Sequence, residues 1–441
     1  MASERANVVV FFTDQQRWDT CGCYGGLELT PNLDRLAAGG TRMERAFTCQ
    51  PVCGPARASL QTGRYAAATG VFRNGLALPG AERTLAGRFK EAGYRVGYVG
   101  KWHLGGTRDR PVPADRRGGY DDYWLASDVL EFTSHPTEGH LFDADDRPVE
   151  FTGYRSDFLA ARAAEFIAEA AKAPEPFFLF LSTVEPHHQN DMERFVAPDG
   201  YAARYAAAPV PADLRELPGD WRGQWPDYCG MCARLDENLG SVLAGLDAAG
   251  VRGRTIVAFL SDHGCHFRTR NNEYKRSCHD SSIRVPMVFS GPSFDRRLAI
   301  PECVSLVDVP PTLLDAAGVG APEGMHGRSM TALVERRDDD WPEEAFVQIS
   351  ESEVGRAIRT RRWTYSVFAP GRKGWEDPDC GDQPYVERYL YDLAADPHQR
   401  VNLIGRKSHR EIADRLRDRL IERTAAAGEP APTVEPARYF A

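Results

Sequence analysis

The sequence predicts an α/β protein in which a large, mainly parallel central sheet is flanked by helices and followed by a smaller C-terminal α+β domain. Short apolar, β-rich runs alternate with helical segments along most of the chain, which is typical of parallel sheets covered by helices. Polar clusters stand where several of these runs end. From about Ala345 the rhythm changes to closely spaced short strands and one charged helix, so we expect domains over residues 1–344 and 345–441.

The predicted strands of the first domain are apolar runs short enough to be buried strands. They are Asn7–Phe12, Tyr94–Val99, Phe177–Ser182, Thr255–Leu260 and Val285–Phe289. Three of these strands are followed by polar clusters, namely Thr13 to Gln16, Glu185 to His188 and Ser261 to Gly264. Because open parallel sheets bind ligands beyond the carboxyl ends of their strands, we expect the three clusters to meet in one crevice.

Helices are predicted between the strands because apolar residues recur there at spacings of three and four. The predicted helices are Asn32–Ala38, Thr84–Ala92, Ser156–Ala171, Pro226–Ala249 and Ser305–Ala317.

The second domain is predicted to hold a small antiparallel sheet and a charged helix. Its strands are Phe346–Ile349, Arg356–Thr360, Trp363–Phe368 and Tyr389–Tyr391, and its helix runs from about His409 to Ala426. The proline-rich end of the chain is expected to lie over the surface as an extended strap.

Composition and charge exclude several classes of protein. Hydrophobic residues make up 42% and charged residues 27% of the 441 positions, which is ordinary for a globular chain and unlike a disordered one. The chain has 54 Lys and Arg against 63 Asp and Glu, a formal charge of −9, which argues against nucleic acid as a partner. No apolar run approaches the roughly 20 residues that span a bilayer. Nor does the start resemble a signal peptide, so we expect no membrane contact and a cytoplasmic location.

The ten cysteines are spread over the whole chain, unlike the dense spacing of a disulfide scaffold. Most are expected to be free, buried thiols. Cys229 and Cys232 have C-x-x-C spacing, but no second pair lies near them and the stretch is helical. We interpret them as a buried structural pair rather than as a redox or metal site.

The most informative segment is Pro51–Tyr65, PVCGPARASLQTGRY. Cys53 to Arg57 fits the pattern C-x-P-x-R, and Leu60 to Gly63 supplies the L-x-T-G that follows it in the sulfatase family. The segment thus resembles that family's modification signal, in which the cysteine is oxidised to formylglycine and the hydrated aldehyde is the nucleophile.

Further segments resemble the same family in the same order along the chain, so the resemblance covers essentially the whole sequence. They are TDQQRWD (Thr13–Asp19), GYRVGYVGKWHLG (Gly93–Gly105), EPHH (Glu185–His188), SDHG (Ser261–Gly264), EYKRSCHDSSIRVPMV (Glu273–Val288) and LYDLAADPHQRVNL (Leu390–Leu403). The resemblance implies an alkaline-phosphatase-like fold and a sulfuric ester hydrolase.

The resemblance also implies a metal site. Asp14, Asp262 and His263 would hold one divalent cation together with the modified residue 53. Gln15 stands where many family members have a second Asp. It is therefore either a neutral metal ligand or a residue that contacts the metal ligands without binding the metal itself. Mostly oxygen ligands favour calcium, with magnesium and manganese as alternatives, whereas the imidazole moves the choice towards manganese or zinc. The cation would lower the pKa of one hydroxyl of the aldehyde hydrate and bind a sulfate oxygen.

By the same resemblance, Arg57 orients the hydrate, and Lys101 and Lys275 bind the sulfate oxygens. His187 protonates the leaving oxygen, and His188 competes with it for that role. Departure of the alcohol leaves a sulfated hemiacetal on residue 53. His103 then removes a proton, so that sulfate is expelled and the aldehyde is restored.

Three observations bear on the substrate. Asn74 either hydrogen-bonds a sulfate oxygen or is a turn residue before a glycine. His266 directly follows the predicted metal ligands and is expected to line the substrate pocket. Within residues 266–276 four cations, Arg268 and Arg270 among them, stand against Glu273 alone. This surplus favours an anionic substrate such as a sulfated uronate-containing sugar, unless the arginines pair with acidic residues across the domain interface.

The predicted function is therefore hydrolysis of a sulfate ester of a sulfated, anionic carbohydrate, so the expected partner is a sulfated small molecule or an oligosaccharide. The resemblance implies one protein partner, a formylglycine-generating maturation enzyme, and the oligomeric state stays open. A phosphonate monoester or phosphodiester hydrolase with the same nucleophile is the closest alternative, because phosphoryl and sulfuryl transfer need similar electrostatics. Lys101 and His103 both fit sulfatase roles and favour the sulfatase. A non-catalytic glycan-binding protein is set aside because every catalytic residue type is present.

Overall fold

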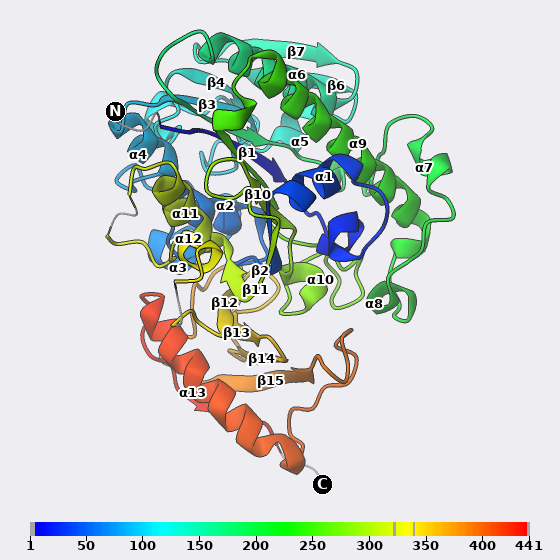
Figure 1. Ribbon diagram of the computed structural model, residues 1–441. Helices are drawn as coiled ribbons and strands as arrows, with labels where there is room; N and C mark the ends of the chain where they lie inside the picture. The colour runs from blue at the N-terminus through cyan, green and yellow to red at the C-terminus, as the bar shows by residue number, and fades with distance from the viewer. Residues whose placement is uncertain (1–4, 321–322, 338–339, 439–441) are drawn as a thin grey trace.

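A computed structural model describes residues 5–320, 323–337 and 340–438. Within these residues the chain forms a large α/β body around an eleven-stranded sheet and a second, five-stranded sheet near the C-terminus (Figure 1). The predicted fold class is confirmed. None of the described helices is both long and apolar enough to cross a membrane.

The large sheet has the order β11-β2-β10-β9-β1-β8-β3-β4-β6-β5, with β7 paired to β6. Its strands are β1 (Asn7–Thr13), β2 (Thr41–Phe47), β3 (Arg95–Lys101), β4 (Tyr123–Ser127), β5 (Ser134–His135), β6 (Glu138–Phe142), β7 (Pro148–Thr152), β8 (Phe177–Ser182), β9 (Thr255–Ser261), β10 (Met287–Ser290) and β11 (Leu298–Ser305). At its centre β1 runs parallel to both β8 and β9. The predicted strand Val285–Phe289 corresponds to β10, which runs antiparallel to β9 and β2.

Helices cover both faces of this sheet because the side chains of a strand alternate between its faces. Val8, Val10 and Phe12 of β1 pack on the face covered by α2, α4 and α11, whereas Val9 and Phe11 face α1, α6 and α9. The helices are α1 (Pro31–Gly39), α2 (Cys53–Thr62), α3 (Ala66–Thr69), α4 (Leu85–Glu91), α5 (Leu130–Thr133), α6 (Arg155–Ala170), α7 (Tyr201–Arg204), α8 (Ala212–Arg215), α9 (Trp221–Ala248), α10 (Asp280–Ile283), α11 (Val309–Ala316), α12 (Thr331–Val334) and α13 (Arg410–Ala426).

One helix begins earlier than predicted. The sequence placed its start at Pro226, where the missing N–H usually marks a first turn, but α9 begins at Trp221 and contains the proline. Trp221 and Trp225 are buried in an apolar cluster that is separate from the main core. Their burial stabilises the additional first turn of α9.

The second sheet has the order β12-β13-β14-β15-β16. Its strands are β12 (Glu344–Ile349), β13 (Gly355–Thr360), β14 (Trp363–Phe368), β15 (Tyr385–Asp392) and β16 (Val434–Glu435). Leu416 and Leu420 of α13 pack against this sheet, and Figure 1 shows α13 running alongside the sheet at the bottom of the view. The predicted strap contributes β16, which runs parallel to β15 at the sheet edge, and its last three residues lie outside the described part of the chain.

Candidate active site

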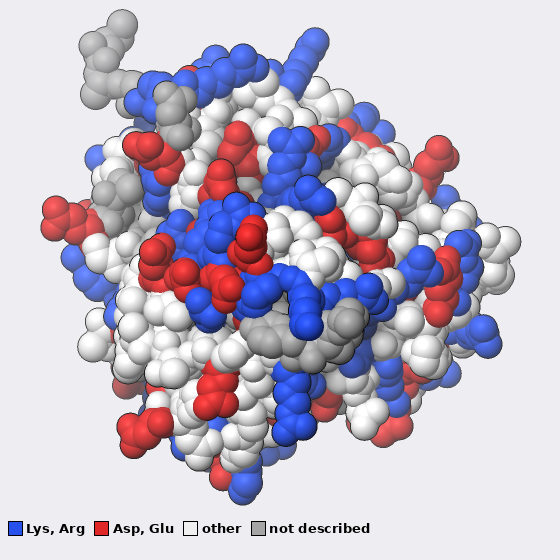
Figure 2. Space-filling model, turned by 90° about the horizontal axis from the view of Figure 1, so that it is seen from below, with Lys and Arg blue, Asp and Glu red and all other residues white. Residues whose placement is uncertain are grey.

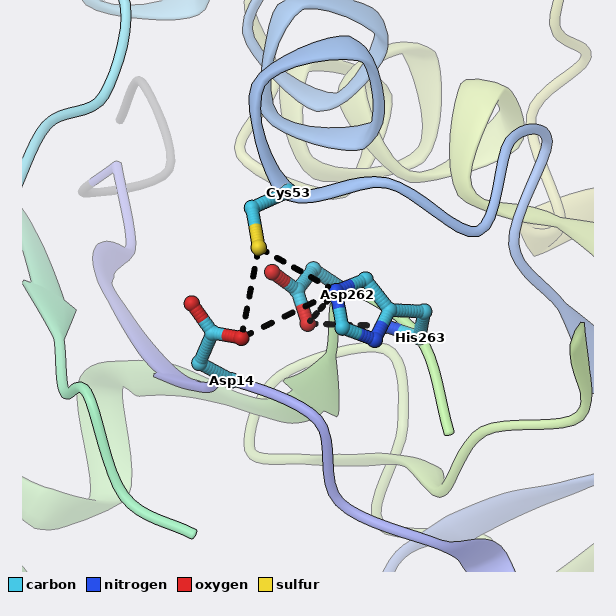
Figure 3. A group of neighbouring side chains, drawn as sticks. All are labelled: Asp14, Cys53, Asp262 and His263. Carbon is cyan, nitrogen blue, oxygen red and sulfur yellow. Dashed lines mark hydrogen bonds and ion pairs between the residues drawn. The ribbon is translucent and has the colours of Figure 1, made fainter. Parts of the chain in front are cut away.

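The site lies where the central strands end, as the polar clusters predicted. Thr13 and Ser261 are register partners at the ends of β1 and β9, so Asp14 and Asp262 emerge side by side. Cys53 is the first residue of α2, a helix whose residues are all buried. Figure 3 shows Asp14, Cys53, Asp262 and His263 pointing toward one another from these three segments.

The four side chains form a tight, buried cluster, in which one potential ligand atom of each lies within 4.8 Å of the others. Cys53 Sγ is 3.3 Å from His263 Nε2 and 3.6 Å from Asp14 Oδ1. His263 Nδ1 is 3.0 Å from the Gly264 carbonyl oxygen, which can only accept. Nδ1 therefore carries the hydrogen, and the lone pair of Nε2 faces the carboxylates, as a metal-binding histidine requires.

Asp262 supplies a direct indication that the cluster fits a cation. Its Oδ2 is buried without a hydrogen-bond partner among the described residues. Burial and, next, the charge of Asp14 raise the pKa of Asp262 to about 7. Two buried carboxylates, one thiol and an imidazole lone pair are a donor set that suits a divalent cation.

Three cations surround the cluster. Lys101 Nζ donates to Asp14 Oδ2 at 2.8 Å, and Arg57 Nη2 donates to the same oxygen at 3.0 Å. Burial alone would raise the pKa of Asp14, but the charges of Lys101 and Arg57 outweigh it and hold that pKa well below its usual value. Lys275 Nζ is 3.0 Å from Cys53 Sγ. The site is therefore positive around its carboxylates, as an anionic substrate requires.

Lys275 and Lys101 also lower the pKa of the Cys53 thiol, outweighing its burial and the nearby Asp14, which would raise it. The side chain of His103 adds a hydrogen bond to Cys53 in the same direction. The predicted nucleophile position is thus the point on which the cations and His103 converge.

His187 lies beside this cluster. Its Nδ1 donates to the backbone oxygen of His188 at 2.6 Å, and its Nε2 accepts from Lys275 Nζ at 3.0 Å. Burial, followed by the charge of Lys275, holds the pKa of His187 well below its usual value, so the ring is neutral here. His188 stacks on His187 and lies against Tyr274 at a tilt.

Several predicted site residues support the cluster from outside it. Gln15 Oε1 accepts from Lys275 Nζ at 3.3 Å, and the backbone N–H of Gln15 donates to Asp262 Oδ1 at 2.9 Å. Asn74 Oδ1 accepts from the N–H of Gly54 at 2.9 Å. Its side chain is therefore committed to the start of α2, where Val52 offers no side-chain cap.

Two further groups assigned to the substrate, His266 and Arg270, lie differently from that expectation, whereas Arg268 is partly exposed. His266 is fully buried, and its Nε2 donates to the Lys275 carbonyl at 2.9 Å, so it supports the Lys275 segment instead of lining a pocket. Arg270 donates to the carbonyls of Gln399 and His398 at 2.8 and 2.6 Å. The Arg268 guanidinium carbon lies 4.8 Å from the centroid of the Tyr274 ring, and Arg268 Nε is 3.6 Å from Asp220 Oδ2. The Arg268 side chain is 44% exposed, so a ligand can still reach it.

Sequence reasoning missed two members of the site. Glu131 Oε1 accepts from Lys101 Nζ at 2.7 Å, and Lys101 outweighs burial to lower the pKa of Glu131 to about 2. Ser182 Oγ accepts from Arg57 Nη1 at 2.6 Å. Ser182 ends a predicted strand and was therefore detectable by position, whereas Glu131 lies in the four-residue α5, where no motif marks it.

Comparisons with known proteins agree with this geometry. Residues 6–319 match the Sulfatase family, and residues 272–426 match the family described as N-sulphoglucosamine sulphohydrolase, C-terminal. The ulvan-active sulfatase of Formosa agariphila is 31% identical over 96% of this chain and 82% of its own length.

Two solved structures share the fold. A putative sulfatase from Bacteroides fragilis superposes with a TM-score of 0.83 at 24% identity, covering 98% of this chain and 97% of its own. A protein solved with its substrate D-glucosamine-2-N,6-O-disulfate superposes with a TM-score of 0.79 at 22% identity, covering 97% of this chain and 99% of its own. With the family match over most of its length, the protein belongs to the sulfatase family, and it is a sulfuric ester hydrolase with an alkaline-phosphatase-like fold.

Proposed function

We propose that the protein hydrolyses a sulfate ester of a carbohydrate, with a formylglycine hydrate derived from Cys53 as its nucleophile and one divalent cation at the site. The observation that carries this proposal is the position of Cys53. It opens α2 within the C-x-P-x-R pattern, and its Sγ faces Asp14, His263 and Lys275 at 3.0 to 3.6 Å.

Asp14, Asp262 and His263, with the modified residue 53, would hold the cation, and calcium is our first choice for it because most of these ligands are oxygens. When bound, the cation lowers the pKa of a coordinated hydroxyl and neutralises charge on a sulfate oxygen. The orphaned Asp262 Oδ2 supports this assignment. A formylglycine-generating enzyme carries out the oxidation of Cys53. The chain therefore requires this enzyme as a partner in its maturation.

The chain's own residues bind the sulfate and move the protons. Lys275 and Lys101 are buried cations beside residue 53 and bind the sulfate oxygens. His187 gives a proton to the leaving alcohol from Nε2. Lys275 donates to that atom in the absence of substrate, so a sulfate that draws Lys275 away frees Nε2 and favours its protonation. His103 is placed beside residue 53 to accept a proton as sulfate departs.

Lys101 is held in place for this work by its own partners. Glu131 and Asp14 bind its Nζ from two sides and, against burial, raise its pKa. Arg57 donates to the Lys101 carbonyl at 2.9 Å. Lys101 therefore remains charged and fixed, so that little reorganisation is needed when the sulfate arrives.

Support for a carbohydrate comes from the Formosa agariphila relative, which is named as active on ulvan, and from the surplus of cations between residues 266 and 276. Of these cations, Lys275 lies in the site and Arg268 is partly exposed, whereas Arg276 is paired with Glu351 and Arg270 binds backbone carbonyls. A sulfated oligosaccharide with further negative charge is the substrate class that fits Arg268.

The proposal is tested on protein produced together with a formylglycine-generating enzyme. Mass spectrometry of the peptide spanning Cys53 should show the thiol replaced by an aldehyde. The converted protein should then release sulfate from sulfated sugars with a higher kcat/KM than it shows for phosphonate monoesters or phosphodiesters. A higher kcat/KM for the phosphorus esters would assign it to that hydrolase class, and turnover by the unconverted thiol would exclude the proposed nucleophile.

A further inference from the structure

We propose that Glu351, in the turn between β12 and β13 of the C-terminal sheet, is a positioning residue for the active site. It holds the start of α2, which carries Cys53, and the segment that carries Lys275. The kinetic part of this inference rests on the proposed function, and the structural part does not.

The first link runs to Cys53 through Asn74. Glu351 Oε1 accepts from the backbone N–H of Asn74 at 2.7 Å. Asn74 Oδ1 in turn accepts from the N–H of Gly54 at 2.9 Å. Since the first N–H groups of a helix have no partner within the helix, Asn74 supplies the missing acceptor beside Cys53, and Glu351 fixes where Asn74 lies.

The second link runs to Lys275 through Arg276. Glu351 Oε2 accepts from Arg276 Nε at 2.6 Å and also pairs with Arg276 Nη2. Lys275, the preceding residue, places its Nζ 3.0 Å from both Cys53 Sγ and His187 Nε2. One carboxylate thus joins two chain segments that are far apart in sequence and meet at the nucleophile.

The rest of the turn holds the same segments. Ser352 Oγ donates to the Arg276 carbonyl at 2.8 Å, and Ser350 Oγ accepts from Gln50 Nε2 at 2.7 Å. The N–H of Gln348, on β12, donates to the carbonyl of Cys49 at 2.8 Å. The second sheet and its turn therefore bind the chain just before Cys53, at Cys49 and Gln50, and next to Lys275, at Arg276.

Glu351 shows the strain and burial expected of a position with a specific task. Its φ of 65° and that of Arg276, 68°, lie in the left-handed region, which such residues occupy only when their surroundings hold them there. The Glu351 side chain is fully excluded from solvent, and that of Arg276 is 13% exposed. A buried ion pair is stable only where its geometry is good and further hydrogen bonds satisfy its charges. The Glu351 carboxylate meets this condition by binding Arg276 and the backbone N–H of Asn74.

The test compares Glu351→Ala and Glu351→Gln with the wild type, with every rate corrected for the aldehyde content of residue 53. Glu351→Ala should lower kcat about 10- to 100-fold with a much smaller change in KM, because small displacements of reacting groups have effects of that size. Glu351→Gln keeps an acceptor for Asn74 but loses the charge that binds Arg276, so its kcat should fall less.

Glu429→Gln is the matched control. Glu429 is a buried carboxylate that binds Arg356 of β13 at 3.0 Å and accepts from Gln348 Nε2 at 2.6 Å. Glutamine at position 429 keeps an acceptor for Gln348, and none of the hydrogen bonds of Glu429 within the described chain reaches Asn74 or residues 275–276. Loss of the Glu429 charge should lower Tm but leave kcat within about two-fold of the wild type.

A double variant tests whether Glu351 and Arg276 act together. The kcat of Arg276→Ala combined with Glu351→Gln should be no lower than that of the slower single variant, because both changes remove the same interaction.

Hydrogen exchange supplies a readout that does not depend on turnover. In Glu351→Ala the amides of Gly54 and Asn74 and those of residues 270–280 should exchange faster, whereas in Glu429→Gln they should not. Equal losses of kcat in Glu351→Ala and Glu429→Gln, additive effects of the double variant, or unchanged exchange at the two segments would overturn the proposal. If the wild-type enzyme released no sulfate from any sugar, the proposed function would fail, and the exchange data would still decide the role of Glu351.

Discussion

Asp262 Oδ2 is a buried carboxylate oxygen that accepts no hydrogen bond within the described chain. Arg57 Nη2 lies 3.6 Å from it, and a second carboxylate, Asp14, lies beside it. Burial and the charge of Asp14 disfavour the ionised form of Asp262, so a divalent cation bound there should stabilise the fold. We therefore expect calcium to raise Tm in the wild type, by an amount that corresponds to about 2.7 kcal/mol at a concentration 100 times Kd. Asp262→Asn should abolish most of that gain, and without added metal its Tm should equal or exceed that of the wild type treated with a chelator. Thermal unfolding with and without calcium checks this, and a full calcium response in the variant would contradict it.

Two arginines of the same loop should respond differently to substitution. Arg270 binds the carbonyls of His398 and Gln399, so Arg270→Ala should destabilise the protein by about 2 kcal/mol through its lost hydrogen bonds, without selective change in KM. Arg268 is the exposed one. Arg268→Ala should raise KM for a sulfated, further charged oligosaccharide by up to about five-fold, since an exposed pair contributes at most about 1 kcal/mol. KM for a simple aryl sulfate should not move. Kinetics on both substrates and urea unfolding check the pair, and equal KM changes for both substrates would contradict it.

The residues that the sequence predicted for the site are those that carry a local pattern. Cys53 and Arg57 belong to one motif, and Asp14 and Asp262 follow apolar strands. Glu131 and Glu351 have no such mark, because they reach Lys101 and Arg276 only through the tertiary fold. A buried carboxylate whose role is to position a Lys or Arg side chain therefore cannot be recognised from the sequence. It is recognised only when the structure shows which cation it binds.

At the level of elements, α1 depends on a cap supplied by another helix. The Thr30 side chain does not cap it, but Asp236 of α9 accepts from the N–H groups of Asn32 and Leu33 at 2.9 and 2.8 Å. A carboxylate at a helix start also interacts favourably with the helix dipole. Asp236→Ala should therefore lower the free energy of unfolding by about 2 to 3 kcal/mol, as measured by urea denaturation. Asp247→Ala, on an exposed position of the same helix, should change it by less than about 0.5 kcal/mol, and an equal loss in both variants would refute the cap.

The strands that were predicted and those that were not differ in burial. β1, β8 and β9 lie at the centre of the sheet and are buried at every position, so their apolar runs stand out. β2, TRMERAF, alternates buried and partly exposed side chains, and its charges conceal it. β5, β6 and β7 are short strands that contain several polar residues. The short strands β5, β6 and β7 lie together at one end of the sheet and depend on pairing with one another, so the local sequence gives little sign of them.

At the scale of the whole molecule, the second sheet is joined to the body by apolar contact and by charge. Val347, Ile349 and Ala357 pack on Phe47 and Ile283 of the body. The face seen from below, on the side of α13, carries acidic and basic side chains interspersed with one another (Figure 2). On α13, Arg417 pairs with its neighbours Asp414 and Asp418. Between the two parts of the molecule, Arg400 and Glu216 form an exposed ion pair, whereas Arg359 and Asp280 form a largely buried one.

This buried pair should make the union of the two sheets sensitive to acid. Arg359 of β13 binds Asp280 of α10 through two hydrogen bonds of 2.7 and 2.8 Å. Burial would raise the pKa of Asp280, but Arg359 outweighs it and lowers that pKa. A carboxyl group with a lowered pKa stabilises the fold above its usual pKa, about 3.9, and this stabilisation is lost as the pH falls through the folded-state value.

Asp280→Asn should therefore cost about 3 kcal/mol at pH 7, where it leaves Arg359 buried without a counter-charge. The difference in stability between wild type and variant should shrink as the pH falls below about 4, because the wild-type carboxyl then becomes neutral as well. Urea unfolding of both proteins at pH 7, 5 and 3.5 measures this, and Asp418→Asn, at an exposed pair, should stay within about 0.5 kcal/mol of the wild type throughout. A difference of the same size at every pH would show that the shape of the Asp280 side chain, and not its charge, holds the two sheets together.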